Sequence, residues 1–287
     1  MISADWPAPA KLNLFLHVLG RRPDGYHELQ TAYQLIDFAD DLTFGLREDG
    51  EIRRPEGPPS VPAETDLAVR AARQLQAAAN NRRGVDIRIR KRIPIQGGLG
   101  GGSSDAATTL VALNELWGIR LPVGQLAGIG RELGADVALF IHGHSAWGEG
   151  IGERLTPIEL PPRHYAVVFP GIGVSTAEVF QASELTRNSP SLTIRGFLQA
   201  GGRNDCAPVA TGRYPEVAAA LAWLARSGDA RLTGTGSCVF AGFAERAEAE
   251  AALSDLPDEW SGFVARGLDR SPLQERLAAE RARQGQI

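Results

Sequence analysis

The fold of this chain is decided by Pro94-Ile95-Gln96-Gly97-Gly98-Leu99-Gly100-Gly101-Gly102-Ser103-Ser104-Asp105-Ala106-Ala107. Five of the six residues after Gln96 are glycine, which lets the backbone take a positive φ and lets a ligand approach the main chain closely. A helical run follows at once, and the first turn of a helix offers unpaired N–H groups and the positive end of its dipole. The stretch therefore predicts a cradle for phosphate and favours a nucleotide-using enzyme.

The segments on either side frame these glycines as a turn between a strand and a helix. Residues 85–89 alternate apolar and charged side chains, which is typical of a half-buried strand. Apolar residues recur at helical spacing from Ala106 to Trp117, and Gly118 stands where a helix-ending glycine is expected. The alternative, a flexible linker, rarely opens directly into an amphipathic helix. We therefore predict a phosphate-binding loop.

The common phosphate-binding motifs do not match this loop. A Walker A loop needs a lysine after its last glycine, but Ser103 follows Gly102. The dinucleotide fingerprint has no match in the stretch, and the chain lacks the catalytic segments of protein kinases. The pattern Pro-x-x-x-Gly-Leu-Gly-x-x-Ser-Ser-x-Ala-Ala instead resembles the signature of the galactokinase, homoserine kinase, mevalonate kinase and phosphomevalonate kinase (GHMP) superfamily.

Composition narrows the class of protein further. With 287 residues the chain can form one large or two modest domains, and its net charge of −4 gives no general affinity for nucleic acid or for an anionic membrane. Cys206 and Cys238 match neither a zinc spacing nor a disulfide framework, so a reducing, cytoplasmic location is expected. No signal peptide and no membrane span are expected. The sequence does not indicate an oligomeric state.

Lysine is rare in this chain. Only two of the 30 basic side chains are lysines, Lys11 and Lys91. Genome composition is one explanation, but arginine cannot replace a compact ammonium at a tight site, so each lysine is a functional candidate. Residues 10–18 predict a strand whose period of two places Lys11, Asn13, Phe15 and His17 on one face.

Strands and helices are mixed without regular βαβ alternation, which predicts an α+β fold. The pattern predicts a loop at 47–63 and a domain boundary in the proline-rich residues 156–162, which divides the chain into 1–156 and 157–287. The other strands are expected at 30–38, 41–46, 145–150, 164–169, 231–233, 238–240 and 263–266, and the other helices at 66–79, 123–133, 137–141, 176–180, 214–224, 244–253 and 272–283.

Five motifs follow one another along the chain in a fixed order. They are Pro9-Ala10-Lys11-Leu12-Asn13-Leu14, Asp24-Gly25-Tyr26-His27, the glycine loop, Leu133-Gly134-Ala135-Asp136-Val137 and Leu232-Thr233-Gly234-Thr235-Gly236. Together they resemble one branch of the GHMP superfamily, which phosphorylates a cytidyl-diphosphate sugar alcohol, a small molecule, in the non-mevalonate isoprenoid precursor pathway.

The resemblance implies two domains with mixed, mostly antiparallel sheets, ATP bound by the first domain, substrate by the second, and the active site between them. It implies ATP as donor, Mg²⁺ as cofactor and the 2-hydroxyl as acceptor. A homoserine or mevalonate type of kinase and an inactive ATP-binding sensor remain alternatives.

Two charged residues are the catalytic candidates. An alcohol is a poor nucleophile, and a carboxylate within hydrogen-bond reach can orient it and accept its proton. The resemblance assigns this role to Asp136, although the bare sequence favours a helix N-cap there. Lys11 is expected to keep that carboxylate ionised and to stabilise the transferred charge, with a solvated strand residue as the alternative.

The remaining candidates bind nucleotide or substrate. Ser103 and Ser104 are expected to bond phosphate or Mg²⁺, or else to cap the helix, and the metal carboxylate stays unassigned. Asp105 is expected to face away from the phosphates and stabilise the helix start. Tyr26 and Phe180 suit a sandwich around cytosine, His27 its hydrogen-bonding edge and Asn13 the sugar hydroxyls, although aromatic residues more often fill a core. The ATP-binding set is Lys91, Pro94, Ile95, Gln96, Gly97, Gly98, Leu99, Gly100, Gly101, Gly102, Ser103 and Ser104, and the lesser substrate candidates are Thr176 and residues 234–237.

Overall fold

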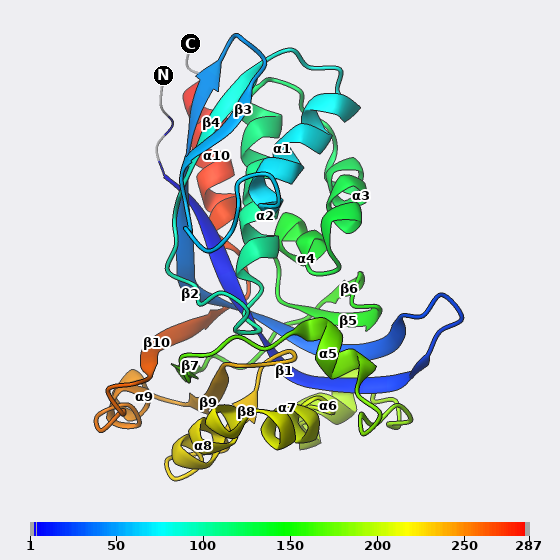
Figure 1. Cartoon of the computed structure of the whole chain (residues 1–287), viewed down its shortest axis with the longest axis vertical. Helices are drawn as coiled ribbons and strands as arrows, with labels where there is room; N and C mark the ends of the chain where they lie inside the picture. Colours follow the sequence, from blue (N-terminus) through cyan, green and yellow to red (C-terminus); the bar gives the residue numbers. More distant parts are fainter. Residues whose placement is uncertain (1–2, 4, 285–287) are drawn as a thin grey trace.

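Strands from both halves of the chain join into one mixed sheet with helices packed against it. The computed structural model describes residues 3 and 5–284 (Figure 1). The main path of the sheet runs β3-β4-β2-β10-β7-β9-β8, with β1, β5 and β6 attached through β2 and β5. Every strand pair is antiparallel except β3 with β4. The α+β prediction is confirmed.

Two long strands run through the whole molecule. β1 (Trp6–Arg21) and β2 (His27–Arg47) form a hairpin that reaches from the upper group of helices to the lower one (Figure 1). Along its other edge β2 pairs in turn with β5, β10 and β4. The prediction of two separate strands at 30–38 and 41–46 is wrong. The buried Asp40 lies within the single strand, because its carboxylate accepts hydrogen bonds from the backbone N–H groups of Arg92 and Ile93.

The first group of elements surrounds the largest core. The buried face of β2 and β4 packs against α1 and α2, and Leu273 of α10 joins the same core (Figure 1). The Asp66 carboxylate accepts a hydrogen bond from the N–H of Ala68 and caps α1. This agrees with the prediction of a helix that begins at Asp66. The elements of this group are β3 (Ile52–Glu56), α1 (Leu67–Ala78), β4 (Gly84–Arg90), α2 (Gly101–Leu116), α3 (Val123–Leu133), α4 (Val137–His142), β5 (Ala146–Gly150), β6 (Arg154–Pro157) and α10 (Pro272–Gln284).

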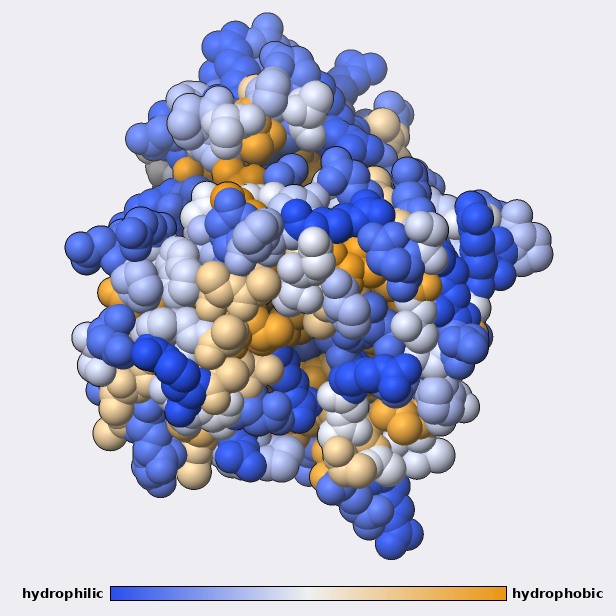
Figure 2. All heavy atoms as spheres, turned by 60° about the horizontal axis from the view of Figure 1, so that its bottom comes forward, coloured by the Kyte–Doolittle hydropathy of each residue, from blue (hydrophilic) through white to orange (hydrophobic). Residues whose placement is uncertain are grey.

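The second group covers the other end of the hairpin. Its core combines Val168 of β7 and Val239 of β9 with Leu16 and Val18, which come from β1. Figure 2 brings this end forward and shows a largely hydrophilic surface with apolar patches between the charged side chains. The elements are β7 (His164–Phe169), α5 (Thr176–Gln181), α6 (Ile194–Ala200), α7 (Ala207–Arg213), α8 (Pro215–Leu224), β8 (Arg231–Leu232), β9 (Val239–Phe243), α9 (Arg246–Ala251) and β10 (Ser261–Leu268).

Several elements differ from the sequence prediction. The predicted loop at 47–63 contains β3, an edge strand that pairs with β4 on one side only, so Pro55 needs no backbone donor there. β6, α6 and α7 were not predicted at all. The division at 156/157 stays a prediction, and two segments cross it: α10 packs on the first core and β1 on the second. Within the described residues no helix is long and apolar enough to span a membrane.

Candidate active site

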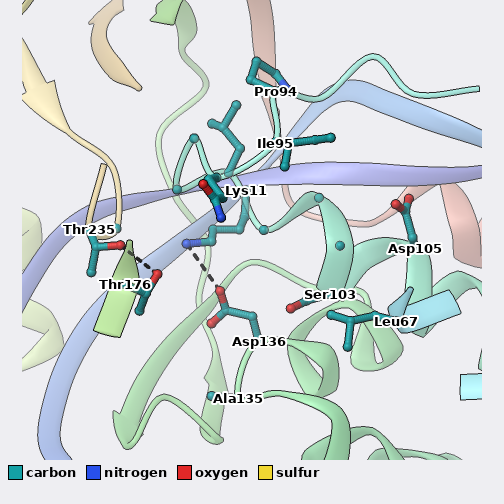
Figure 3. A pocket seen from close by; sticks show the side chains of 18 of the residues that line it. Lys11, Leu67, Pro94, Ile95, Ser103, Asp105, Ala135, Asp136, Thr176 and Thr235 are labelled. Carbon is teal, nitrogen blue, oxygen red and sulfur yellow. Dashed lines mark hydrogen bonds and ion pairs between the residues drawn. The ribbon is translucent and has the colours of Figure 1, made fainter. Parts of the chain in front are cut away.

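A cavity of about 550 Å³ lies where the glycine loop, the β1–β2 hairpin and the second group of elements meet. Figure 3 shows Lys11, Asp136 and Ser103 directed into it, with Thr176 and Thr235 at one side. Most of the predicted site residues line the cavity, and the exceptions are Tyr26, His27, Ser104, Gly236 and Ser237. The predicted residues that line it are Lys11, Asn13, Lys91, Pro94, Ile95, Gln96, Gly97, Gly98, Leu99, Gly100, Gly101, Gly102, Ser103, Asp136, Thr176, Phe180, Gly234 and Thr235.

The carbonyls of the glycine loop are tied away from the cavity. Gln96 O accepts from Val174 N at 3.2 Å, and Gly97 O accepts from Cys238 N at 3.0 Å. The next two carbonyls follow the same pattern, since Gly98 O accepts from the Thr233 hydroxyl and Leu99 O from Lys11 N. Four consecutive carbonyls therefore bond to the surrounding protein. This arrangement leaves the intervening N–H groups for a ligand, as an anion site requires.

The first turn of α2 likewise has backbone N–H groups that no protein group accepts. Gly100 is its N-cap residue, with a φ of 74°, and no side chain caps the helix. The first backbone N–H of the helix with a protein partner belongs to Ser104, which donates to Gly100 O. Ser103 and Ser104 lie inside the helix, so the alternative that either serine is the N-cap is wrong. The uncapped turn presents N–H groups and a positive dipole end toward the cavity.

Gly98 and Gly100 of this loop have no room for a side chain. A Cβ on Gly98 would lie 2.2 Å from the carbonyl oxygen of Thr233. A Cβ on Gly100 would lie 2.9 Å from the ring of Phe140 and 3.2 Å from Lys11 Cε. Both glycines also have a positive φ. The loop therefore packs tightly between β1 and the turn at residues 233–236.

The two predicted catalytic residues meet at this loop. Lys11 Nζ lies 3.4 Å from Asp136 Oδ2, and the lysine is almost fully buried while the carboxylate side chain is 25% exposed (Figure 3). Asp136 precedes α4 but makes no capping hydrogen bond to it. Its Oδ1 accepts instead from the Tyr33 hydroxyl at 3.1 Å. The carboxylate is thus held by side chains from β1 and β2, with one face open to the cavity.

Asn13 lies beside this pair. Its Oδ1 accepts from Lys11 Nζ, and its Nδ2 donates to the Thr31 hydroxyl at 2.8 Å. Its backbone N–H donates to Thr233 Oγ1 at 3.0 Å, which joins β1 to the turn after β8. The amide is therefore fixed by bonds on both of its polar atoms.

The face shared by Lys11 and Asn13 ends at Asn13. The pairing of β1 with β2 shifts register between Asn13 and Leu16, and Leu16 rather than Phe15 lines the cavity. Phe15 packs on Trp147, and His17 Nδ1 contacts the carbonyl of Pro190. The prediction that Phe15 and His17 share a face with Lys11 and Asn13 is wrong, because a bulge inserts an extra residue and exchanges the two faces of the strand.

Lys91 is engaged by two buried carboxylates. Its Nζ lies 2.6 Å from Asp40 Oδ2 and 2.7 Å from Asp105 Oδ2. Burial raises the pKa of Asp105 to about 7, with Lys91 opposing the shift and Asp40 adding to it. Asp105 Oδ1 and the Ser104 hydroxyl are buried without a protein partner among the described side chains. The prediction that Asp105 faces away from the phosphate site is wrong, because Asp105 lines the cavity. Its carboxylate ties the first turn of α2 to β2 through Lys91.

The predicted base-binding residues gather at the hairpin tip. The rings of His27 and Phe180 stack with centroids 5.3 Å apart, and Phe180 lines the cavity. Arg187 donates to His27 Nε2 at 3.0 Å and to the Phe180 carbonyl, so one guanidinium positions both rings. Tyr26 lies outside the cavity lining with 61% of its surface exposed. Thr176 and Thr235 bring α5 and the second glycine turn together through hydroxyls 3.0 Å apart.

Sequence reasoning missed several residues of the cavity. Tyr33 lies in a predicted strand, but only the register of β1 against β2 places it opposite Asn13. The one sequence signal for Tyr33 was the period of two of a strand, which places it on the same face as Thr31. The other missed lining residues are Leu16, Leu29, Pro58, Val61, Thr65, Asp66, Leu67, Ala135 and Ile151.

Comparison with known proteins agrees with this geometry. Residues 66–144 match the family model of the GHMP kinases N terminal domain, and residues 188–262 match that of the GHMP kinases C terminal domain. A 4-diphosphocytidyl-2-C-methyl-D-erythritol kinase of Halorhodospira halophila is 58% identical over 98% of both chains. The chain belongs to the 4-diphosphocytidyl-2-C-methyl-D-erythritol kinase family of GHMP kinases. Another relative with that name, from Alkalilimnicola ehrlichii, is 57% identical over 97% of this chain and 96% of its own.

Solved structures of GHMP kinases share the fold. A crystal structure of a 4-(cytidine 5'-diphospho)-2C-methyl-D-erythritol kinase superposes with a TM-score of 0.79 at 34% identity, covering 92% of this chain and 99% of that one. A mevalonate kinase superposes with a TM-score of 0.68 at 16% identity, which is a likeness of fold alone. The predicted GHMP kinase architecture is thereby confirmed, and the protein is a kinase with ATP as phosphoryl donor and a small molecule as acceptor.

Proposed function

We propose that this kinase transfers the γ-phosphoryl group of ATP to the 2-hydroxyl of 4-diphosphocytidyl-2-C-methyl-D-erythritol. The names of the relatives give the substrate, and their identity of 52–58% over nearly the whole chain supports the transfer of that name. The observation that carries the mechanism is the ion pair of Lys11 and Asp136 beside the glycine loop. An inactive ATP-binding sensor would have no need for this buried pair.

Asp136 and Lys11 act on the acceptor hydroxyl. The Oδ2 atom of Asp136 orients the hydroxyl and takes its proton as the new O–P bond forms and the bond from phosphorus to ADP breaks. Phosphoryl transfer is mostly positioning and charge stabilisation. The ammonium of Lys11 supplies the charge, since it keeps the carboxylate ionised and attracts the transferred phosphoryl oxygens.

The glycine loop and the start of α2 hold the triphosphate. Their free N–H groups and the helix dipole favour an anion, and the outward-tied carbonyls keep the loop in the receptive shape. Lys91 contributes through the helix start, because both of its carboxylate partners already engage its ammonium. Its predicted direct contact with ATP stays a prediction.

The donor set of this site suits a magnesium ion carried by the nucleotide. Within the described chain no cluster of three or more metal-ligating side chains exists, and Mg²⁺ typically binds through few protein oxygens plus substrate phosphates and water. The Ser103 hydroxyl points into the cavity from the first turn of α2, so it is the oxygen that would hold the ion (Figure 3). When bound, Mg²⁺ would neutralise charge on the phosphates.

The cytidyl end of the substrate lies at the hairpin tip. The His27–Phe180 stack offers flat faces and a hydrogen-bonding edge, and the exposed Tyr26 ring is available to cover a bound cytosine. Asn13 lines the cavity beside Lys11 of the catalytic pair, and we assign it to the sugar hydroxyls. A cytoplasmic location stays a prediction.

A coupled assay tests the substrate directly. The purified protein is incubated with ATP, Mg²⁺ and the cytidyl substrate, and in parallel with homoserine or mevalonate, and ADP release is followed. We expect turnover with the cytidyl substrate and little with the other alcohols. Robust turnover of homoserine or mevalonate would overturn the substrate assignment, and no turnover of any alcohol despite ATP binding would favour the sensor.

A further inference from the structure

We propose that Tyr33 is a positioning residue of the phosphoryl transfer, whose hydroxyl fixes the orientation of the Asp136 carboxylate. The inference rests on the proposed function, and it concerns a residue outside every motif that the sequence singled out.

The geometry leaves Tyr33 one role at the carboxylate. Its hydroxyl donates to Asp136 Oδ1 at 3.1 Å, while Oδ2 lies toward Lys11. With Oδ1 occupied, Oδ2 is the oxygen left to receive the proton of the acceptor hydroxyl. Lys11 Nζ also lies 5.7 Å from the centre of the Tyr33 ring, so the ring and the carboxylate together hold the ammonium.

The fold builds a tight seat for this phenol. Tyr33 is only 3% exposed and pairs with Ala146 of β5. A Cβ on Gly148 would lie 2.5 Å from Tyr33 Cε2, and one on Gly152 would lie 2.4 Å from the hydroxyl oxygen. Two glycines from the β5–β6 hairpin thus make room for the ring and its oxygen. A ring held this closely has one orientation, and that orientation directs the hydroxyl to Asp136.

The charges around the pair keep Tyr33 a donor. The titratable groups that face Asp136 are Lys11 of β1 and Tyr33 of β2, and Glu153 of the β5–β6 turn faces the tyrosine. Burial, and then the Asp136 charge, raise the pKa of Tyr33 well above its usual range, so the phenol stays protonated at neutral pH. A phenol that stays protonated keeps its hydrogen bond to the carboxylate and so holds Asp136 in one orientation.

The decisive variant is Tyr33→Phe, which keeps the ring and removes the donor. We expect kcat to fall about tenfold, as for loss of a hydrogen bond to a charged group. The KM values for ATP and the cytidyl substrate stay within about twofold, because the hydroxyl bonds the carboxylate rather than a ligand. A purely structural tyrosine would change stability or both KM values, whereas a positioning residue lowers kcat alone.

Two further variants complete the test. Tyr165→Phe removes another buried tyrosine hydroxyl, which contacts Gln34 away from the carboxylate, and we expect an unchanged kcat. Gly148→Ala keeps the Tyr33 hydroxyl but displaces its ring, and we expect the same loss of kcat as for Tyr33→Phe; it serves as the test if Tyr33→Phe does not fold. A folded Tyr33→Phe variant with the kcat of the wild type would overturn the inference alone, whereas a wild-type protein without turnover would refute the proposed function.

Discussion

Lys11 and Asp136, 125 residues apart in the chain, form an ion pair of 3.4 Å at the edge of the glycine loop. The backbone N–H of Lys11 also donates to Leu99 O of that loop at 3.0 Å. One residue of β1 is therefore bonded through its main chain to the phosphate loop and through its side chain to the carboxylate. This double attachment fixes the distance between the glycine loop and the Asp136 carboxylate.

The close packing of Gly98 against the Thr233 carbonyl predicts that Gly98→Ala distorts the phosphate loop. Its added Cβ would lie 2.2 Å from a backbone oxygen, and its φ is 77°. We expect the ATP dissociation constant to rise at least about tenfold in calorimetric titrations, because the N–H groups of the loop no longer point at the phosphates.

The matched control is Gly128→Ala in α3, where no atom lies within 4 Å of the added Cβ. That variant should bind ATP normally and gain up to about 1 kcal/mol in helix propensity. Equal ATP affinity of the two variants would contradict the role given to the loop.

The raised pKa of Asp105 leads us to predict that the free energy of unfolding depends on pH. Its pKa is raised to about 7 in the folded protein by burial, from an ordinary value near 4. A raised acid pKa gives a stabilising contribution that is complete below the unfolded value and is lost as pH rises through the folded value. Between pH 4 and 7 the contribution of Asp105 to the free energy of unfolding therefore declines.

The measurement for Asp105 is urea unfolding of the wild type and of Asp105→Asn at pH 5 and pH 8. We expect the wild type to lose more stability between these pH values than the variant, whose amide does not titrate. Lys91 keeps Asp40 as a partner in the variant, so the protein should still fold. Parallel pH dependence in the two proteins would rule out titration of Asp105 in this range.

The hydrogen bond from Arg187 to His27 leads us to predict that Arg187 affects the binding of the cytidyl substrate and not that of ATP. A guanidinium stays protonated, so His27 Nε2 must accept its hydrogen bond and the ring proton lies on Nδ1. Burial, then Arg187 and Arg21, lower the pKa of His27, which keeps the ring neutral. Arg187→Met should raise the KM for the cytidyl substrate by about tenfold and leave the KM for ATP unchanged. Arg246→Met, which breaks only a surface pair with Glu250, is the control. A rise in both KM values would mean that Arg187 supports the whole cleft rather than the base site.

The sequence identifies the residues that carry the chemistry of the site, but it does not give the register in which β1 and β2 pair. The glycine loop, Lys11 and Asp136 could be predicted because each has a local signature and a chemical reason. The single strand β2 could not, because its continuity at Asp40 depends on hydrogen bonds from Arg92 and Ile93, which lie some fifty residues later.

The bulge after Asn13 and the place of Tyr33 were hidden for the same reason. Each depends on which residues of β1 and β2 lie opposite one another, and a shift of one residue exchanges the faces of a strand. The partners of Lys91 and His27 are likewise remote in sequence, since Asp40 and Arg187 come from other elements. Long-range pairing, rather than local propensity, therefore limits what the sequence alone predicts here.

The central claim, that Asp136 receives the acceptor proton beside the loop-bound triphosphate, is tested most directly by Asp136→Asn. The variant keeps the size of the side chain and removes its charge and basicity. In single-turnover measurements with ATP and the cytidyl substrate, we predict a loss of phosphoryl transfer of at least about 100-fold, with ATP affinity unchanged. An Asp136→Asn protein that transfers phosphate at the wild-type rate would contradict the account.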